Sequence, residues 1–292
     1  MIGRNDFCWC GSGKKWKKCH YPEVSNSGGG PIAAQYLKKY DVLVKSPEQI
    51  EGIRGASRLA AEILDKTCRM AKAGVTTLEL NDYAHQLHLD AGAIPAPLNY
   101  SQPPYPKSLC TSINEVICHG IPDGTVLKDG DIINIDVTAI LNGYFGDCSR
   151  MVTIGEVSED KQLVVDVSRE CLRLSGDALR PGMELSEIGD IIESYATSKK
   201  CSVVYQFVGH GVGVNFHEAP EVQHCRNNSH LKLVPGMTFT IEPMINAGKA
   251  EGVIDKNDHW TVSTVDGCPS AQWEHTFLIT EKGREVLTSF EG

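Results

Sequence analysis

The spacing of apolar residues between positions 46 and 82 predicts two consecutive helices. Ser46, followed by Pro47 and then by Gln49, has the form of a helix N-cap with a capping box. The apolar residues of the next stretch fall on one helical face: Ile50, Ile53, Ala56, Ala60, Ile63 and Leu64. We expect this helix to end before Gly74 and another to begin within residues 75–82.

This pattern returns 108 residues later in the chain. The repeated positions are Gly74, Glu79, Leu80 and Asp82, matched by Gly182, Glu187, Ile188 and Asp190. Each set follows one long amphipathic helix and precedes a second. The repetition predicts an α+β fold of two helix-helix-strand halves related by pseudo-twofold symmetry, with the strands in one curved sheet and the helices on its outer face.

Five residues with metal-binding side chains lie inside apolar runs of strand character: Asp136, Asp147, His210, Glu242 and Glu274. A buried carboxylate is costly unless it is paired or binds a metal, and nearby lysines and arginines are too few to neutralise four. For any one of these acids, the simpler explanation is a residue at a strand end that faces solvent. Because the same pattern occurs four times, a shared metal site is favoured. The turn signal at Leu141-Asn142-Gly143 predicts that Asp136 and Asp147 face each other across a hairpin.

Charge balance then predicts how many metal ions this cluster holds. Four carboxylates are neutralised by two divalent cations, and a two-metal site generates a bridging hydroxide as the nucleophile at neutral pH. Oxygen-rich ligands with one imidazole suit Mn(II), Fe(II) or Co(II) at least as well as Zn(II).

The length and composition fit one large domain with a small appendage. The chain has 292 residues, of which 41% are hydrophobic, and no apolar run of about 18 residues predicts a membrane span. Residues 1–20 lack the pattern of a signal peptide. Eleven cysteines, an odd number without the spacing of a small disulfide scaffold outside the front motif, indicate a reducing, cytoplasmic location.

A second metal-binding pattern lies at the front of the chain: Cys8, Cys10, Cys19 and His20. Three thiols and an imidazole complete a tetrahedral zinc site without an open position, which is typical of structural zinc. The alternative is that these cysteines form disulfides or have no specific role. We therefore expect a zinc module at 1–24, a linker at 25–42 that starts with a flexible Ser/Gly stretch, and a catalytic domain at 43–292. After the flexible stretch, residues 33–45 should pack along the enzyme.

Three motifs carry a resemblance to the bacterial type I methionine aminopeptidases: residues 106–122, Gly209-His210-Gly-Val-Gly213 and Ile241-Glu242-Pro243. The resemblance runs from about residue 43 to the end, and it implies the two-half pita-bread fold and removal of the initiator methionine from nascent chains, preferably before a small second residue. It further implies that Asp136 holds one ion, that His210 and Glu242 hold the other, and that Asp147 and Glu274 bridge them.

The resemblance also implies roles around the metals. Glu242 would handle the proton of the attacking water, His217 would donate to the scissile carbonyl oxygen, and His119 would contact the amide after the methionine. The matching methionine-pocket positions are Tyr105, Cys110, Phe216 and Trp260. Residues 99–105 are two residues longer than in the family, which leaves open the role of Tyr100. A sodium or potassium site of backbone carbonyls would match Asn114, Val116 and Ser270.

The front motif resembles the SEC-C motif, which also precedes some methionine aminopeptidases. Residues 1–40 carry a net charge of +5 while the whole chain carries −9. A basic module on an acidic enzyme that acts on nascent chains suggests docking on ribosomal RNA. A lysine-covered zinc knuckle that binds no RNA is an equal alternative. No membrane or DNA partner is expected.

Two other functions are compatible with the same fold. An aminopeptidase that cleaves X-Pro bonds would share all five metal ligands, although the segment 114–119 and the absence of a large amino-terminal domain argue against it. A non-enzymatic, ribosome-associated homologue is disfavoured by the intact ligands and histidines.

Overall fold

The computed structural model describes residues 14–15 and 30–289. The helices in this part of the chain are α1 Pro31–Tyr40, α2 Pro47–Met70, α3 Thr77–Asp90, α4 Glu159–Ala178 and α5 Ser186–Ser198. None of the helices described is long and apolar enough to cross a membrane.

The strands are short apart from one long hairpin. They are β1 Ile94–Pro95, β2 Cys110–Ile113, β3 Val116–Cys118, β4 Ile132–Leu141, β5 Tyr144–Thr153, β6 Ser202–Val203, β7 Gly209–Gly211, β8 Glu218–Val222, β9 Thr238–Ile241, β10 Met244–Asn246, β11 Gly252–Ile254, β12 Val262–Thr264, β13 Ser270–Gln272, β14 His275–Thr280 and β15 Gly283–Val286.

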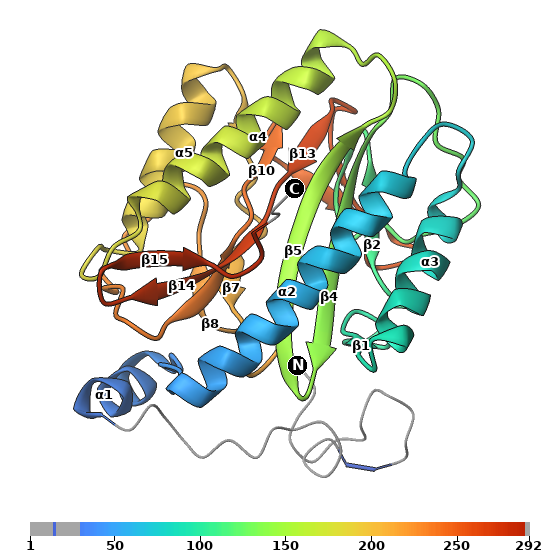
Figure 1. The fold of residues 1–292 in the computed structure, drawn as a ribbon. Coiled ribbons are helices and arrows are strands. Elements are labelled where there is room, and N and C mark those ends of the chain that lie inside the picture. Colours follow the sequence, from blue (N-terminus) through green and yellow to red (C-terminus); the bar gives the residue numbers. More distant parts are fainter. Residues whose placement is uncertain (1–13, 16–29, 290–292) are drawn as a thin grey trace.

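The predicted helix starts are confirmed. The Ser46 side chain accepts the backbone N–H of Gln49, whose side chain accepts the N–H of Ser46 in return. Thr76 and Glu79 form a second capping box at the start of α3. Figure 1 shows α2 crossing the β4–β5 hairpin with α3 beside it, and α4 over β10 and β13 with α5 beside α4.

The two halves use the same backbone contacts at equivalent positions. The N–H of Gly74 donates to Leu127 O at 2.9 Å, and the N–H of Gly182 donates to Leu233 O at 2.8 Å. Both glycines have positive φ, 91° and 82°, which costs glycine little. Each is followed by an antiparallel bridge, Thr76 with Val126 and Glu184 with Lys232. These contacts confirm the α+β fold of two related halves.

The strands do not form one continuous sheet as expected. Within the described residues they pair into four sheets, β1-β4-β2 with β5 beside β4, β13-β10-β6, β11-β12-β3 and β15-β14-β9-β7-β8. Most strands have only two to five residues, and register shifts interrupt two pairs, so the ladders stay short. The pairing of β3 with β12 and an isolated bridge between Ser149 and Glu274 connect the two halves.

The segment before α2 packs against the large domain. Tyr36 on α1 lies in the core and donates its hydroxyl proton to Lys232 O at 2.8 Å, and Val42 pairs with Ala219. These residues fall within the segment 25–42 for which we expected a linker. Residues 25–29 lie outside the described part.

Candidate metal centre

Three of the five predicted metal ligands meet at one point. Asp147 on β5, His210 on β7 and Glu274 just before β14 each offer a ligand atom, and these atoms lie within 4.8 Å of one another. Nε2 of His210 lies 3.7 Å from Asp147 Oδ2 and 3.6 Å from Glu242 Oε1. The imidazole therefore sits between carboxylates from both halves of the fold.

Asp136 joins this cluster from β4, but not in the predicted register. The Asn142-Gly143 turn pairs Leu141 with Tyr144, so Asp136 lies opposite Ser149 and Asp147 lies opposite Thr138. The two aspartates are thus diagonal neighbours on one face of the hairpin and not directly opposite each other. Diagonal positions in a sheet remain within reach of each other's side chains.

Hydrogen bonds orient the ligand side chains. Thr138 Oγ1 donates to Asp147 Oδ1 at 2.7 Å. The two oxygens of Glu242 accept from Thr240 Oγ1 at 2.8 Å and from Gln272 Nε2 at 2.9 Å. Nδ1 of His210 lies 3.0 Å from Gly211 O. A proton on that nitrogen leaves Nε2 as the free electron-pair donor, the arrangement typical of histidine metal ligands.

Burial and mutual repulsion act together on the carboxylates of this cluster. Burial is the largest cause that raises the pKa of each of the four acids well above its ordinary value, and the charge of Asp147 raises the pKa of Asp136 and of Glu274 further. No lysine or arginine of residues 30–289 lies within ion-pair distance of them. Four desolvated carboxylates with one imidazole are a donor set that fits two divalent cations.

Both predicted catalytic histidines border this cluster. The His217 ring centroid lies 4.1 Å from that of His210. His217 has an exposed face, yet protein surrounds the rest of the ring, so desolvation, followed by the neighbouring His210 and His119, lowers its pKa well below the ordinary value. Burial lowers the pKa of His119 to about 4. Both imidazoles are therefore neutral at pH 7.

The predicted pocket residues form two aromatic groups beside these histidines. Tyr105 and Trp260 meet edge to face at 5.2 Å, and Trp260 lies 6.0 Å from His119. Phe216 contacts Tyr100 at 4.8 Å. The buried Cys110 is paired with Asp136 across β2 and β4. The sequence left the role of Tyr100 open. In the structure this residue lies with Phe216 beside the metal cluster.

The sequence analysis did not predict some residues of the site. Thr240 and Gln272 bind Glu242, and Nε2 of His224 accepts the Glu242 N–H at 3.1 Å. Strand alternation could have found Thr240, because residues two apart share a face of a strand. His224 and Gln272 come from other segments, and no local signal marks them.

The predicted monovalent-cation residues lie close together. The N–H of Ser270 donates to Asn114 O at 2.9 Å, and Val116 begins β3 two residues on. The Ser270 hydroxyl is buried without a hydrogen-bond partner. Cation binding by Asn114, Val116 and Ser270 stays a prediction.

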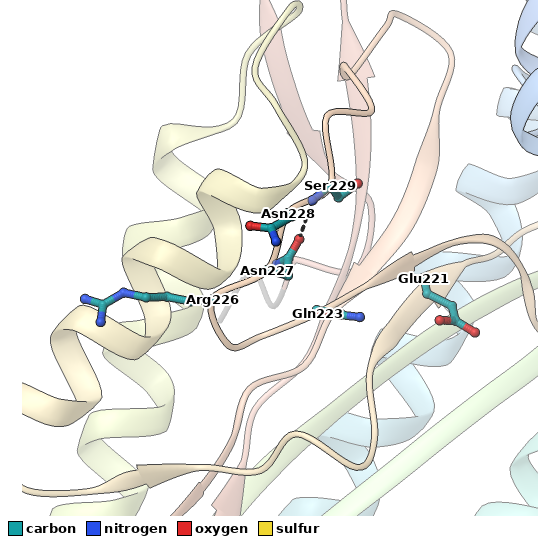
Figure 2. A pocket seen from close by; sticks show the side chains of 6 residues that line it. All are labelled: Glu221, Gln223, Arg226, Asn227, Asn228 and Ser229. Carbon is teal, nitrogen blue, oxygen red and sulfur yellow. Dashed lines mark hydrogen bonds between the residues drawn. The ribbon is translucent and has the colours of Figure 1, made fainter.

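A polar hollow of about 530 Å³ contains none of the predicted site residues. It lies along β8 and the loop after it, and Figure 2 shows its lining side chains, with the Ser229 N–H donating to Asn227 Oδ1 at 3.0 Å. The lining residues are Glu221, Gln223, Arg226, Asn227, Asn228 and Ser229. The hollow is therefore separate from the metal centre. The predicted zinc ligands Cys8, Cys10, Cys19 and His20 lie outside the described residues.

Comparison with known proteins agrees with this site. The chain matches metallopeptidase family M24 over residues 51–281 and the SEC-C motif over residues 4–22. It is 57% identical to a methionine aminopeptidase of Chlamydia muridarum over 98% of both chains. The crystal structure of methionine aminopeptidase from Rickettsia prowazekii superposes with a TM-score of 0.82 at 44% identity, over 85% of this chain and 100% of that one.

A more distant likeness supports the fold alone. An Xaa-Pro dipeptidase from Bacillus anthracis superposes with a TM-score of 0.68 at 19% identity, over 89% of this chain and 64% of that one. The meeting of Asp147, His210 and Glu274, the two-half fold and the full-length likeness agree. This chain belongs to metallopeptidase family M24, and within it to the methionine aminopeptidases.

Proposed function

We infer that this enzyme removes the N-terminal methionine from nascent polypeptides, preferably when the second residue is small. The observation that carries this proposal is the convergence of Asp147, His210 and Glu274 beside His217. Metallopeptidases of this family use divalent metals, and relatives named methionine aminopeptidase match the chain almost end to end.

Five residues of the chain would bind the two cations. Asp136 would hold one divalent cation, His210 and Glu242 the other, and Asp147 and Glu274 would bridge both. When bound, such cations polarise a scissile carbonyl and lower the pKa of water so that it attacks at neutral pH. Cobalt, manganese, iron and zinc all fit this mixed donor set.

The remaining residues would move protons and bind the substrate. Glu242 receives the proton of the attacking water. His217 donates a hydrogen bond to the carbonyl oxygen as negative charge develops there. His119 contacts the amide that follows the methionine. Tyr105, Cys110, Phe216 and Trp260 would line the methionine pocket, since aromatic rings suit a flexible thioether.

The front of the chain would add a structural zinc and a docking function. Cys8, Cys10, Cys19 and His20 would hold the zinc, and the lysines between them would attach the module to ribosomal RNA. The cysteines within residues 30–289 are all free thiols, which supports a reducing, cytoplasmic location. A sodium or potassium ion would sit at Asn114, Val116 and Ser270.

A peptide set tests the proposal. The intact protein, loaded anaerobically with one metal at a time, is given Met-Gly-Met, Met-Phe-Met and Ala-Pro-Ala peptides. We expect free methionine from Met-Gly-Met, much less from Met-Phe-Met, and no alanine from Ala-Pro-Ala. Cleavage of Ala-Pro-Ala alone would instead support the X-Pro aminopeptidase function, and inactivity with every metal would support the non-enzymatic one.

A further inference from the structure

Tyr100 contacts both a predicted pocket residue and a predicted catalytic residue. Its ring centroid lies 4.8 Å from that of Phe216, and its hydroxyl lies 2.8 Å from Nδ1 of His217. Phe216 and His217 come from the loop between β7 and β8, whereas Tyr100 comes from the loop between β1 and β2. Tyr100 therefore joins two loops that are distant in sequence.

The loop that carries Tyr100 is closed by its own backbone. The N–H of Asn99 donates to Tyr105 O at 2.7 Å, the N–H of Tyr105 donates to Tyr100 O at 2.9 Å, and the N–H of Tyr100 donates to Pro97 O at 3.0 Å. These bonds fix the backbone on both sides of Tyr100. The position from which its hydroxyl contacts His217 is therefore constrained.

The hydrogen bond with Tyr100 determines which nitrogen of His217 carries the proton. Burial raises the pKa of Tyr100 to about 12, so its hydroxyl keeps its proton at neutral pH. An imidazole with one proton carries it on one of its two nitrogens, and Tyr100 already contacts Nδ1 of His217. When the tyrosine hydroxyl donates to Nδ1, that proton must lie on Nε2.

We propose that Tyr100 is a positioning residue that holds His217 in the Nε2–H tautomer and aims this N–H at the substrate's carbonyl oxygen. This inference rests on the oxyanion role proposed above for His217. Without the hydroxyl, either nitrogen of His217 can carry the proton and the ring loses its hydrogen-bonded anchor. The ring of Tyr100 meanwhile keeps its contact with Phe216, so the pocket wall stays.

The substitution Tyr100→Phe tests this inference because it removes the hydroxyl alone. We expect kcat for a Met-Gly-Met peptide to fall about two- to twelve-fold, the range for one net hydrogen bond, with KM nearly unchanged. Tyr36→Phe is the matched control, since it removes a tyrosine hydroxyl that also makes a 2.8 Å bond, to Lys232 O, away from the site. Its kcat should equal that of the unmodified enzyme.

The double variant Tyr100→Phe/His217→Ala distinguishes action through His217 from a local structural effect. We expect it to have the same kcat as His217→Ala alone. An equal fall in kcat with and without His217 would overturn the inference, as would an unchanged kcat in Tyr100→Phe while His217→Ala is impaired. Full activity of His217→Ala would overturn the oxyanion role itself, and this inference with it.

Discussion

Lys45 Nζ lies 2.6 Å from Glu218 Oε1 in an ion pair whose side chains are 1% and 6% exposed. Glu218 directly follows His217, and its carboxylate also accepts from Val214 N at 3.5 Å and from Asn215 Nδ2 at 3.4 Å. Lys45 lies just before α2. The amino-terminal end of the large domain therefore anchors the loop that carries a predicted catalytic histidine.

Breaking this ion pair should destabilise the fold strongly. Lys45→Met leaves the Glu218 carboxylate buried without its partner, which costs about 3–5 kcal/mol. Lys66→Met is the matched control, because the Lys66–Glu62 pair on α2 is 45% and 60% exposed and should contribute about 0.3–0.5 kcal/mol. Urea unfolding measures both losses, and equal losses would contradict the anchoring role.

The buried His88 should make the protein less stable in acid. Its side chain is 0% exposed, with Nδ1 2.8 Å from Ala84 O, and burial lowers its pKa to about 4. Because the pKa in the unfolded chain is about 6.5, the stability linked to this group is complete above pH 6.5. It is lost as the pH falls toward 4, by up to about 3 kcal/mol.

The slope of stability against pH measures this contribution. His88→Gln should lose less unfolding free energy between pH 6.5 and 4.5 than the unmodified protein, whatever its stability at pH 7. Leu89→Gln changes an exposed residue of α3 that carries no titratable group and should keep the original slope. Identical slopes for all three proteins would show that His88 does not titrate on unfolding.

Loss of a bridging carboxylate should disrupt metal binding. Asp147→Ala or Glu274→Ala removes a ligand predicted to bind both ions and upsets the charge balance of the cluster. Metal analysis after dialysis should give fewer than two ions per chain. Asp166→Ala, on the exposed surface of α4, should retain the full metal content. Two retained ions in either ligand variant would argue against a dinuclear centre.

His217→Ala should affect turnover and leave metal content unchanged. The loss of one oxyanion donor costs about 2.7–4 kcal/mol of transition-state stabilisation. Steady-state kinetics should therefore show a large fall in kcat. A rise in KM with kcat intact would instead assign His217 to ground-state binding.

The zinc module should be separable from peptide hydrolysis. Cys8→Ser should release the structural zinc, because a small zinc-bound unit depends on its metal for folding, while short Met-peptides are still hydrolysed. Neutralising Lys14, Lys15, Lys17 and Lys18 should keep the zinc but weaken sedimentation with ribosomes and reduce its salt dependence. Equal sedimentation of the lysine variant and the intact protein would show that these lysines do not contribute to ribosome binding.

The sequence predicted those features that depend on local pattern. The Ser46 cap and the Gly74/Gly182 repetition both follow from periodicity and backbone freedom. The Asn142-Gly143 hairpin was also predicted, but the pairing of Asp136 was wrong because a two-residue turn fixes the register. Contacts such as Tyr100 with His217 arise from loops far apart in the chain, so periodicity carries no sign of them.

The release of methionine from a Met-Ala-Ser peptide by the intact, metal-loaded protein, measured beside Asp147→Ala, tests the central claim most directly. We expect steady production of free methionine by the intact protein and none above background by the variant, because Asp147 lies at the meeting point of the ligands. Equal release by both proteins, or no release by the intact protein with any of the four metals, would contradict the account.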